Sequence, residues 1–317
     1  MLTYIIRRVL VLIPTLFLIT VISYFIMRLC PGDPVQTMYF DPTIDPAQIA
    51  IVREKLGLND PLHLQYFRWV ARFVRGDMGR SFAYNLPVWK LLKVRIGPTA
   101  VLMGMSLLVA YLFSIPIGTI SAIKKYTPLD YTITTFAFFG LSMPNFWLGL
   151  LLIWLFAVIL KILPSYGMYS LFGGGGIIDL VKHLILPVFV LGTMYMAAVT
   201  RYMRAQVLEV LNEDYIQTAR AKGLAERIVI FKHMLRNSLI PIVTLFGLQL
   251  PALFGGALIT EQIFSWPGMG FFYFKAISSR DYPIIMAILT IVSVLTLLGN
   301  FAADLTYGVI DPRIRYN

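Results

Sequence analysis

Ionisable side chains are scarce in this sequence. Asp, Glu, Lys and Arg make up 14% of the 317 residues, whereas hydrophobic residues make up 58%. A typical soluble domain has about 25% charged and about 45–50% apolar residues. The composition therefore excludes an ordinary soluble globular protein and is typical of an integral membrane protein. The single cysteine, Cys30, excludes an intrachain disulfide.

The motifs of common nucleotide and catalytic sites are also missing. No GxxxxGK(S/T) stretch occurs, so the chain has no phosphate loop for ATP, and the "GGGG" at 173–176 is expected to be a flexible outer loop. HExxH and GxSxG are absent. The three histidines, His63, His183 and His233, fall in different predicted loops, where we expect them to be solvated or interfacial. We predict no catalytic residue, metal site or cofactor in this chain.

Acidic residues are almost absent from the apolar runs. Glu261, Asp281 and Asp304 stand only at the ends of such runs, where we expect them to lie at the membrane interface. Ionisable groups inside a span would mark proton relays or ion-coupled transport. Their scarcity disfavours a proton-driven transporter. Energy for any transport is therefore expected to come from outside the chain.

The formal net charge of +11 has two readings. In a soluble protein it would suggest nucleic acid as a partner, but no cluster of interleaved basic and aromatic residues supports this. Cytoplasmic loops of membrane proteins accumulate Lys and Arg. The excess charge therefore points to membrane topology and membrane lipid, and we expect no nucleic-acid partner.

Six charge-free runs are long enough to be membrane spans, because a bilayer core about 30 Å thick requires about 20 helical residues. The first continues without a cleavage site, which favours an uncleaved span over a signal peptide. The third contains Pro144, so it is tilted or kinked there, or part of it leaves the bilayer. The runs are residues 9–27, 97–123, 131–160, 184–200, 238–260 and 282–303.

The distribution of basic residues predicts the orientation of these spans. With the N-terminus inside, the short inner segments carry 13 Lys and Arg, and the short outer loops carry 4. The positive-inside rule therefore places both termini in the cytoplasm. Arg201 and Arg204 directly follow the short fourth run, from whose end they could snorkel. The fold class is thus an all-α integral membrane protein with about six transmembrane helices.

A long outer segment, residues 28–96, follows the first span. It contains turn signals at 59–61 and 75–77 and an amphipathic stretch at 62–74. This stretch is either a helix lying on the outer leaflet or the bundle, or a docking surface for an external partner, and the two are compatible. Its apolar positions at helical spacing are Leu62, Tyr66, Trp69, Val70 and Phe73.

A polar insert, residues 205–237, separates the fourth and fifth runs on the inner side. It predicts two short helices that meet at Gly223, since glycine accepts the left-handed conformation at a helix C-terminus. Ala219 and Ala221 would keep the surface thin enough for another protein to approach; the alternative is a solvated connector. The expected inward residues are Leu208, Leu211, Tyr215 and Ala219 in the first helix and Ile228, Phe231 and Leu235, with Ile230 as a further candidate, in the second.

The insert resembles the cytoplasmic loop of ABC importer permeases, whose consensus is Glu-Ala-Ala, three residues, then Gly. Here Gln217, Thr218, Ala219 and Gly223 fall at those positions, so only the last alanine and the glycine match. The longer string "EDYIQTARAKGL…KHMLRNSLIP" is similar to the peptide/nickel branch of that family. Further stretches that resemble this branch are "PGDP", "GDMGRSF", "SMPNFWLG", "TEQIFSWPGMG" and "DPRIRY".

The resemblance implies a non-catalytic permease subunit in a bacterial or archaeal cytoplasmic membrane. It would form half of a pore with a second homologous permease, and would work with two ATP-binding subunits, which bind the ATP and magnesium, and with an external substrate-binding protein. It implies di- or oligopeptides as substrates, with nickel chelates or glutathione as alternatives. The residues expected to couple the chain to the ATPases are Glu213, Asp214, Gln217, Thr218, Ala219, Arg220 and Gly223.

Three polar residues inside the runs, Ser142, Asn145 and Gln249, should face a cavity or another helix. They could line a transport pathway, although helix-to-helix hydrogen bonding is the favoured interpretation. We divide the chain into residues 1–27, 28–96 and a core of 97–317. A self-sufficient secondary transporter or channel and a structural scaffold subunit remain alternatives.

Overall fold

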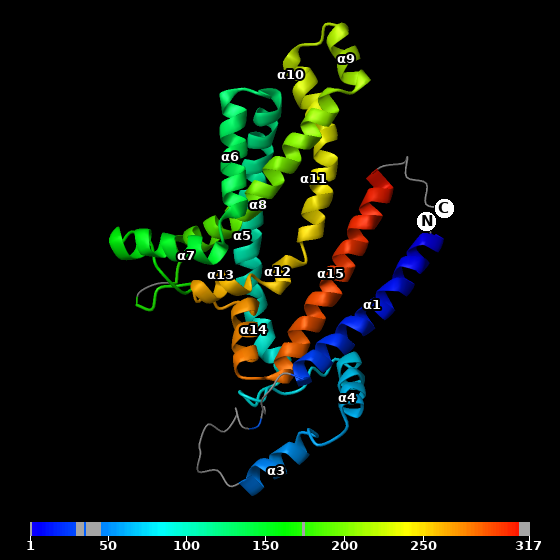
Figure 1. Ribbon diagram of the computed structural model, residues 1–317, viewed down its shortest axis with the longest axis vertical. Coiled ribbons are helices and arrows are strands. Elements are labelled where there is room, and N and C mark those ends of the chain that lie inside the picture. Colours follow the sequence, from blue (N-terminus) through cyan, green and yellow to red (C-terminus); the bar gives the residue numbers. More distant parts are fainter. Residues whose placement is uncertain (1, 30–34, 36–45, 173–174, 311–317) are drawn as a thin grey trace.

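The computed structural model describes the chain except for residues 1, 30–34, 36–45, 173–174 and 311–317 (Figure 1). The side chains of residues 2–7, 9, 46 and 303–310 are not described either. Every regular element in the described part is a helix, with one isolated bridge between Arg80 and Pro87. The all-α expectation is therefore confirmed for these residues.

Long apolar helices form the body of the molecule. They are α1 (Leu2–Leu29), α5 (Val88–Ile123), α8 (Ile177–Leu211), α11 (Leu235–Gln249) and α15 (Tyr282–Ile310). Among the described residues five segments are long and apolar enough to cross a membrane, and a bent helix pair makes a sixth if it counts as one span. The predicted number of spans agrees with this range. The helices extend beyond the charge-free runs, because α5 and α8 continue into polar sequence at their ends.

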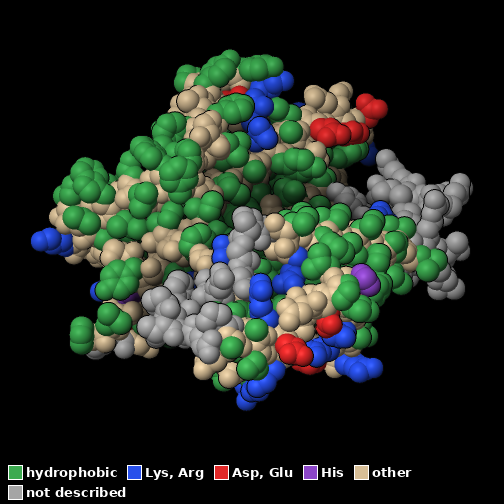
Figure 2. All heavy atoms as spheres, turned by 60° about the horizontal axis from the view of Figure 1, so that its bottom comes forward, with side chains coloured by type: hydrophobic (Ala, Val, Ile, Leu, Met, Phe, Trp, Pro, Cys, Tyr) green, Lys and Arg blue, Asp and Glu red, His purple; other side chains and the backbone are tan. Residues whose placement is uncertain are grey.

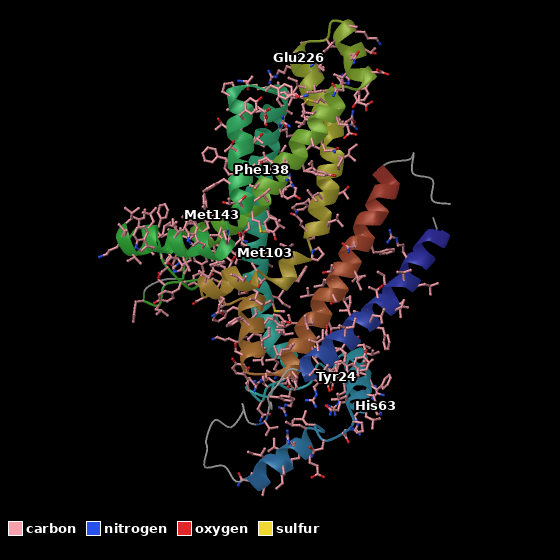
Figure 3. All side chains as sticks on the ribbon, viewed as in Figure 1. Tyr24, His63, Met103, Phe138, Met143 and Glu226 are labelled. Atoms are coloured by element: carbon pink, nitrogen blue, oxygen red, sulfur yellow. The ribbon has the colours of Figure 1, made fainter. Side chains whose placement is uncertain are left out.

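The third run is broken at Pro144, as the sequence indicates. Helix α6 (Pro128–Ser142) runs beside α5, and α7 (Asn145–Leu152) with its π-helical continuation η1 (Ile153–Ile159) turns away by 98° (Figure 1). Met143, at the corner, is labelled in Figure 3. Pro144 has φ −63° and ψ 129°, which is extended backbone and cannot continue α6.

The fifth run is not one continuous helix. Helix α11 ends at Gln249, a single turn, α12 (Ala252–Gly255), follows Pro251, and α13 (Leu258–Ile263) starts in a new direction. Gly256 between them has φ +76°, and a Cβ there would lie 2.7 Å from the amide nitrogen of Gly270. The run of apolar residues concealed this break, since hydropathy does not register a single left-handed glycine.

Two carboxylates expected at the interface are instead fully buried. Glu261 accepts hydrogen bonds from the Thr99 hydroxyl and the Phe271 amide, both at 2.9 Å. Asp281 accepts from the Ser81 hydroxyl and the Ala83 amide, so it holds the outer segment to the start of α15. Both carboxylates are thus enclosed by protein, whereas the side chain of Asp304 lies outside the described residues.

His183 is also buried rather than solvated or interfacial. Its Nδ1 lies 2.8 Å from the backbone oxygen of Asp179, one turn earlier in α8. The expectation for this histidine is therefore wrong. His63 lies on the exposed side of the outer segment, in agreement with the expectation (Figure 3).

The outer segment packs against the first helix. It contains α3 (Pro46–Lys55) and α4 (Leu62–Val74), and α4 coincides with the predicted amphipathic stretch. Tyr66 is buried, its hydroxyl lies 2.9 Å from the Thr20 hydroxyl, and its ring packs edge-on to Tyr24 at 5.5 Å between centroids. The aromatic face of α4 is thus covered by α1, which confirms the expectation of a helix lying on the bundle.

The two longest helices, α5 and α8, form the most extensive helix pair. They approach closely at Gly118, where a Cβ would lie 2.7 Å from the Thr200 backbone oxygen and 2.8 Å from the Met203 Cβ. The Ser114 hydroxyl crosses the interface to the Met196 backbone oxygen at 3.1 Å. A small residue at the crossing lets the backbones meet, which is how helices associate in membranes.

We expect Gly118→Ala to destabilise the protein by about 1–3 kcal/mol, because the added methyl group would force the backbones of α5 and α8 apart. Gly104→Ala in the same helix is the matched control, since a Cβ there meets only the Leu253 side chain at 3.8 Å. It should be neutral or slightly stabilising. Thermal unfolding midpoints of the purified variants in detergent measure both effects, and equal midpoints would contradict the close approach.

Candidate coupling surface

The polar insert forms a compact projection at one end of the molecule. Helix α9 (Asp214–Ala221) and the short α10 (Glu226–Ile228) lie beyond the ends of α8 and α11, at the end opposite α3 and α4 (Figure 1). Glu226 lies at this end, and Tyr24 and His63 lie at the other (Figure 3). The two polar parts of the chain are therefore separated by the whole length of the apolar helices.

Helix α9 begins after an interruption of helical structure at Asn212 and Glu213. Helix α8 ends at Leu211, Asn212 donates its side-chain amide to the Leu208 backbone oxygen at 2.9 Å, and Glu213 is extended with ψ 143°. Asn212 suits such a position because its side chain competes for backbone hydrogen bonds. Helix α9 therefore begins in a new register relative to α8.

This new register changes which residues are buried. Ile216 is fully buried and Ala219 is nearly so, and both pack with Met203, Val207 and Met234. Tyr215 was predicted to face inward, but it is 40% exposed. The prediction assumed one continuous helical face across Asn212; after the break Ile216 takes the buried position expected for Tyr215, whereas Ala219 is buried as predicted.

The end of α9 confirms the role predicted for Gly223. The Leu224 amide donates to the Ala219 oxygen at 3.3 Å, and the Gly223 amide donates to the Arg220 oxygen at 2.9 Å. Gly223 has φ +77°, and a Cβ there would meet no atom within 4 Å. This is the Schellman arrangement, in which the glycine is needed for its backbone conformation and not for space.

The second helix of the insert exists but is short, and its inward residues agree with the prediction only in part, since Ile230 and Leu235 pack against the buried cluster. A π-helical turn, η2 (Val229–Met234), connects α10 to α11, and Val229 and Met234 are buried. Ile228 and Phe231, predicted to face inward, are 43% and 63% exposed. A π-helical turn holds more residues than an α-helical one, so the 3.6-residue spacing does not apply there.

Two polar contacts hold α9 in place. Arg220 donates from Nε and Nη2 to the Glu226 carboxylate at 3.2 and 2.6 Å, and the Asn237 amide donates to the Tyr215 hydroxyl at 3.0 Å. The Glu226 carboxylate raises the pKa of Arg220, so the guanidinium stays charged. Both side chains of this pair are exposed, and its contribution to stability is small.

The residues predicted to couple the chain to a partner divide between two faces. Ala219 faces its own chain, so the expectation that it thins the outer surface is wrong, and only Ala221 does so. Thr218 is exposed and its hydroxyl donates to the Asp214 backbone oxygen at 2.9 Å. The exposed members of the set are Glu213, Asp214, Gln217, Thr218, Arg220 and Gly223, and they form one continuous polar surface, named here the α9 surface.

An ion pair that is largely withdrawn from solvent connects α8, the helix that precedes α9 in the chain, to α6. Arg204 donates from Nε and Nη2 to the two oxygens of Asp130 on α6, both at 2.8 Å. Ser121 on α5 donates to the same carboxylate. The sequence indicated that Arg204 could snorkel from the end of the fourth run, whereas through Asp130 it connects three helices. A lone Asp at the edge of an apolar run was the only available signal.

The three candidate pathway residues each have a partner within the protein. Ser142 donates to the Phe138 backbone oxygen at 2.9 Å, Asn145 contacts the Met194 sulfur at 3.2 Å, and Gln249 accepts from the Tyr111 hydroxyl at 3.3 Å. Ser142 and Asn145 flank the bend at Pro144, and Gln249 lies on α11. No hydrogen bond among the described residues joins the three.

Sequence models of two protein families match nearly the whole chain. Residues 114–316 match the binding-protein-dependent transport system inner membrane component, and residues 1–104 match the N-terminal part of the membrane component of such systems. The match over residues 1–104 covers the first span and the outer segment. The match over residues 114–316 covers most of the remaining helices.

Similar proteins span the full length of the chain. The oligopeptide transport system permease protein AppB of Bacillus subtilis is 47% identical over all of both chains. The di/tripeptide transport system permease protein DppB of Pseudomonas aeruginosa is 41% identical over 100% of this chain and 99% of its own. The dipeptide transport system permease protein DppB of Escherichia coli K12 is 39% identical with the same coverage.

A solved structure shares the fold. The methionine ABC transporter MetNI in an inward-facing conformation contains a chain that matches with a TM-score of 0.57 and 17% identity. The match covers 70% of this chain and 97% of that chain. At this identity the likeness concerns the helical architecture alone.

We expect Asp130→Asn to destabilise the protein on the order of 3 kcal/mol, because it leaves the half-buried Arg204 without a counter-charge. Glu226→Gln is the matched control: it removes the acid of the exposed pair with Arg220 and should change the stability by less than about 1 kcal/mol. Thermal unfolding of both variants in detergent tests whether Asp130→Asn lowers the stability more than Glu226→Gln does. A larger effect at Glu226 would contradict it.

Proposed function

The chain belongs to the family of binding-protein-dependent transport system inner membrane components and is a multi-pass permease subunit of an ABC importer, and we propose that it imports di- and oligopeptides. Relatives of 39–47% identity are named for dipeptide, di/tripeptide or oligopeptide transport. These names support peptides over nickel chelates or glutathione. The uncharged spans also suit substrates whose side chains vary.

The α9 surface is the proposed contact with the ATP-hydrolysing subunits. The single observation that carries this proposal is a short, capped helix with an exposed polar face, set on a buried apolar face of its own chain. Because Ile216 and Ala219 pack against Met203 and Val207 of α8, a push on α9 moves α8 with it. Helix α8 has 35 residues, and α5 and α6 are tied to it by Asp130 and Gly118.

The proposed partners supply the functions that this chain lacks. We propose that a second homologous permease completes the pore, that two ATP-binding subunits bind ATP and magnesium at the inner face, and that an external binding protein delivers the peptide. The chain itself is non-catalytic in this scheme, because it lacks a phosphate loop. Closure of the ATPase dimer would bias the spans between outward and inward openings.

The proposed orientation places the α9 surface in the cytoplasm and the outer segment outside a bacterial or archaeal cytoplasmic membrane. Charge counting supports it, with 13 basic residues in the short inner segments against 4 in the short outer loops. The positions of α9 and α4 at opposite ends of the molecule are consistent with it (Figure 1). The segments 1–27, 28–96 and 97–317 then correspond to the first span, the external part and the pore-forming core.

The function is tested by blocking the α9 surface. We expect Thr218→Trp to reduce ATP-driven peptide uptake by the complete transporter in proteoliposomes to below about one tenth, since about 1.4 kcal/mol of lost docking free energy is tenfold. Glu209→Trp, on the exposed side of α8, is the matched control and should retain uptake. The unfolding midpoint of the permease should be the same in both variants.

Two results would contradict the proposal. One is undiminished uptake by the Thr218→Trp transporter, which would remove the α9 surface from coupling. The other is peptide uptake by proteoliposomes that contain this chain without ATP-binding subunits, which would favour a self-sufficient transporter.

The orientation is tested with cysteine labelling. The chain has one cysteine, so Cys30→Ser provides a cysteine-free background for Gln217→Cys and Lys55→Cys. We expect an impermeant maleimide to label Lys55→Cys in intact cells and Gln217→Cys only after permeabilisation, because both positions are exposed but on opposite sides. Labelling of Gln217→Cys in intact cells would reverse the orientation.

A further inference from the structure

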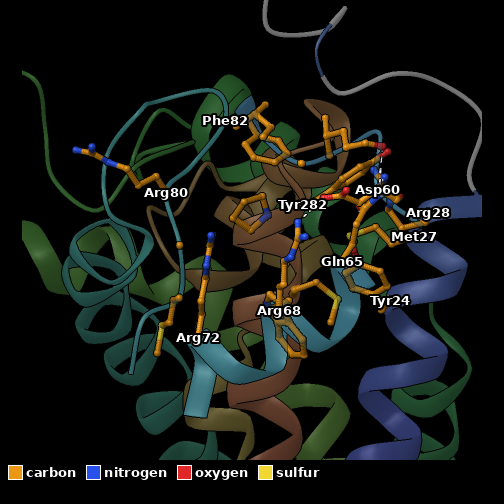
Figure 4. Close-up of a pocket in the computed structure, with 18 of the residues that line it drawn as sticks. Tyr24, Met27, Arg28, Asp60, Gln65, Arg68, Arg72, Arg80, Phe82 and Tyr282 are labelled. Carbon is orange, nitrogen blue, oxygen red and sulfur yellow. Dashed lines mark hydrogen bonds and ion pairs between the residues drawn. The ribbon is translucent and has the colours of Figure 1, made fainter. Parts of the chain in front are cut away.

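A cavity of about 560 Å³ lies in the outer part of the molecule, away from the α9 surface (Figure 4). Its walls come from the outer end of α1, from the end of α3 and the loop after it, from α4, from the loop at 77–82 and from the start of α15. The space-filling view shows Lys and Arg side chains gathered on this face of the molecule (Figure 2). The volume is within the range of small-molecule sites in proteins.

Two N–H donors in the wall of this cavity are buried without an acceptor. They are Nε of Arg28, at the end of α1, and Nε1 of Trp69, on α4. A buried donor without an acceptor is destabilising, and such groups are rare in native proteins. Both orphaned groups are donors, so the ligand that would satisfy them is an acceptor.

The wall around Arg28 is held rigidly by Gln65. The Gln65 Oε1 accepts from Nη2 of Arg28 at 2.8 Å and from the Tyr24 hydroxyl at 3.2 Å. Its amide nitrogen donates to the backbone oxygens of Leu58 and Asp60 at 3.2 and 2.6 Å. The guanidinium of Arg28 also lies 5.2 Å from the Tyr282 ring centroid. Arg28 is therefore positioned by neutral groups, and no carboxylate in the described part of the chain is paired with it.

A second guanidinium is available beside it. Arg72 extends from α4 toward Tyr282 in Figure 4, lines the cavity, and has no hydrogen-bond or ion-pair partner among the described residues. Arg68, one turn earlier, is paired with Asp60. The cavity thus contains one neutralised arginine and three, Arg28, Arg72 and Arg80, that no acid in the described part of the chain neutralises.

We propose that this cavity binds a small peptide through its terminal carboxylate. The guanidinium groups of Arg28 and Arg72 supply the donors, beside the buried Arg28 Nε and Trp69 Nε1, and guanidinium groups bind carboxylates in paired, charge-assisted hydrogen bonds. Tyr24 and Tyr282 supply apolar wall for the peptide backbone and side chains. Glu54 and Asp77 line the same cavity and provide negative charge for the ammonium group at the other end of the peptide.

The test measures binding by the assembled transporter in nanodiscs without ATP or binding protein, so its outcome is independent of coupling. Equilibrium dialysis with labelled trialanine should show saturable binding, and trialanine amide should bind at least about tenfold more weakly, because it lacks the carboxylate. Arg72→Gln should weaken trialanine binding by a similar factor. Arg75→Gln is the matched control: Arg75 is exposed, lies three residues later, does not line the cavity, and should leave binding unchanged.

Arg28→Lys provides a second variant that keeps the charge but removes Nε, and it too should weaken binding. Equal affinity for trialanine and its amide would overturn the proposal. Undiminished binding by Arg72→Gln, or the absence of any saturable binding, would also overturn it. Displacement of trialanine by inorganic phosphate at equal concentration would reject a carboxylate site in favour of a general anion site.

Discussion

Hydrocarbon offers a backbone amide no hydrogen-bond partner, so a chain that crosses a bilayer must satisfy its polar groups internally. Helices do this within themselves, and most of the chain is helical. Where the backbone leaves helical geometry, the protein supplies the missing partner. The carboxylate of Glu261 accepts from the amides of Ala257 and Phe271, on either side of the broken segment between α12 and α14 (Met269–Ser278). The burial of this acid is therefore explained by the irregular backbone around it.

The same constraint explains why so few charges hold the bundle together. A charge removed from water requires a partner of good geometry, and Arg204 has one in the bidentate Asp130. This pair joins α6 to α8, and the close crossing at Gly118 joins α5 to α8. A displacement of α9 would consequently move three helices together and would not be absorbed in a flexible loop. Rigid contacts of this kind are what a two-state transport cycle needs, because packed interfaces switch between arrangements and do not deform continuously.

Local sequence features were predicted well, and features that depend on distant residues were not. The amphipathic helix 62–74, the break at Pro144 and the helix end at Gly223 follow from spacing and from backbone chemistry, and all three are confirmed. On the buried face of α9, Ala219 was predicted correctly but Tyr215 was chosen in place of Ile216, since nothing in the periodicity shows that α8 stops at Leu211. The partner of Glu261 is 162 residues away, and no single-sequence pattern connects them. Of the candidate coupling site, the helix and its cap could be predicted, but its support by Asp130 could not.

A transporter with uncharged spans has little means to recognise a charged terminus while the substrate is within them. A peptide carries an ammonium and a carboxylate whatever its side chains are, and both interact most strongly with groups that are partly withdrawn from water. Such groups occur here at the ends of the spans. Arg204 lies about two turns before the end of α8 and is neutralised by an acid of its own chain, whereas Arg28, in the last turn of α1, is held by Gln65 and keeps an unsatisfied N–H. In the proposed scheme, the charged ends are recognised at the outer face and the peptide then passes through a neutral interior, so that one pathway accepts peptides that differ in every side chain.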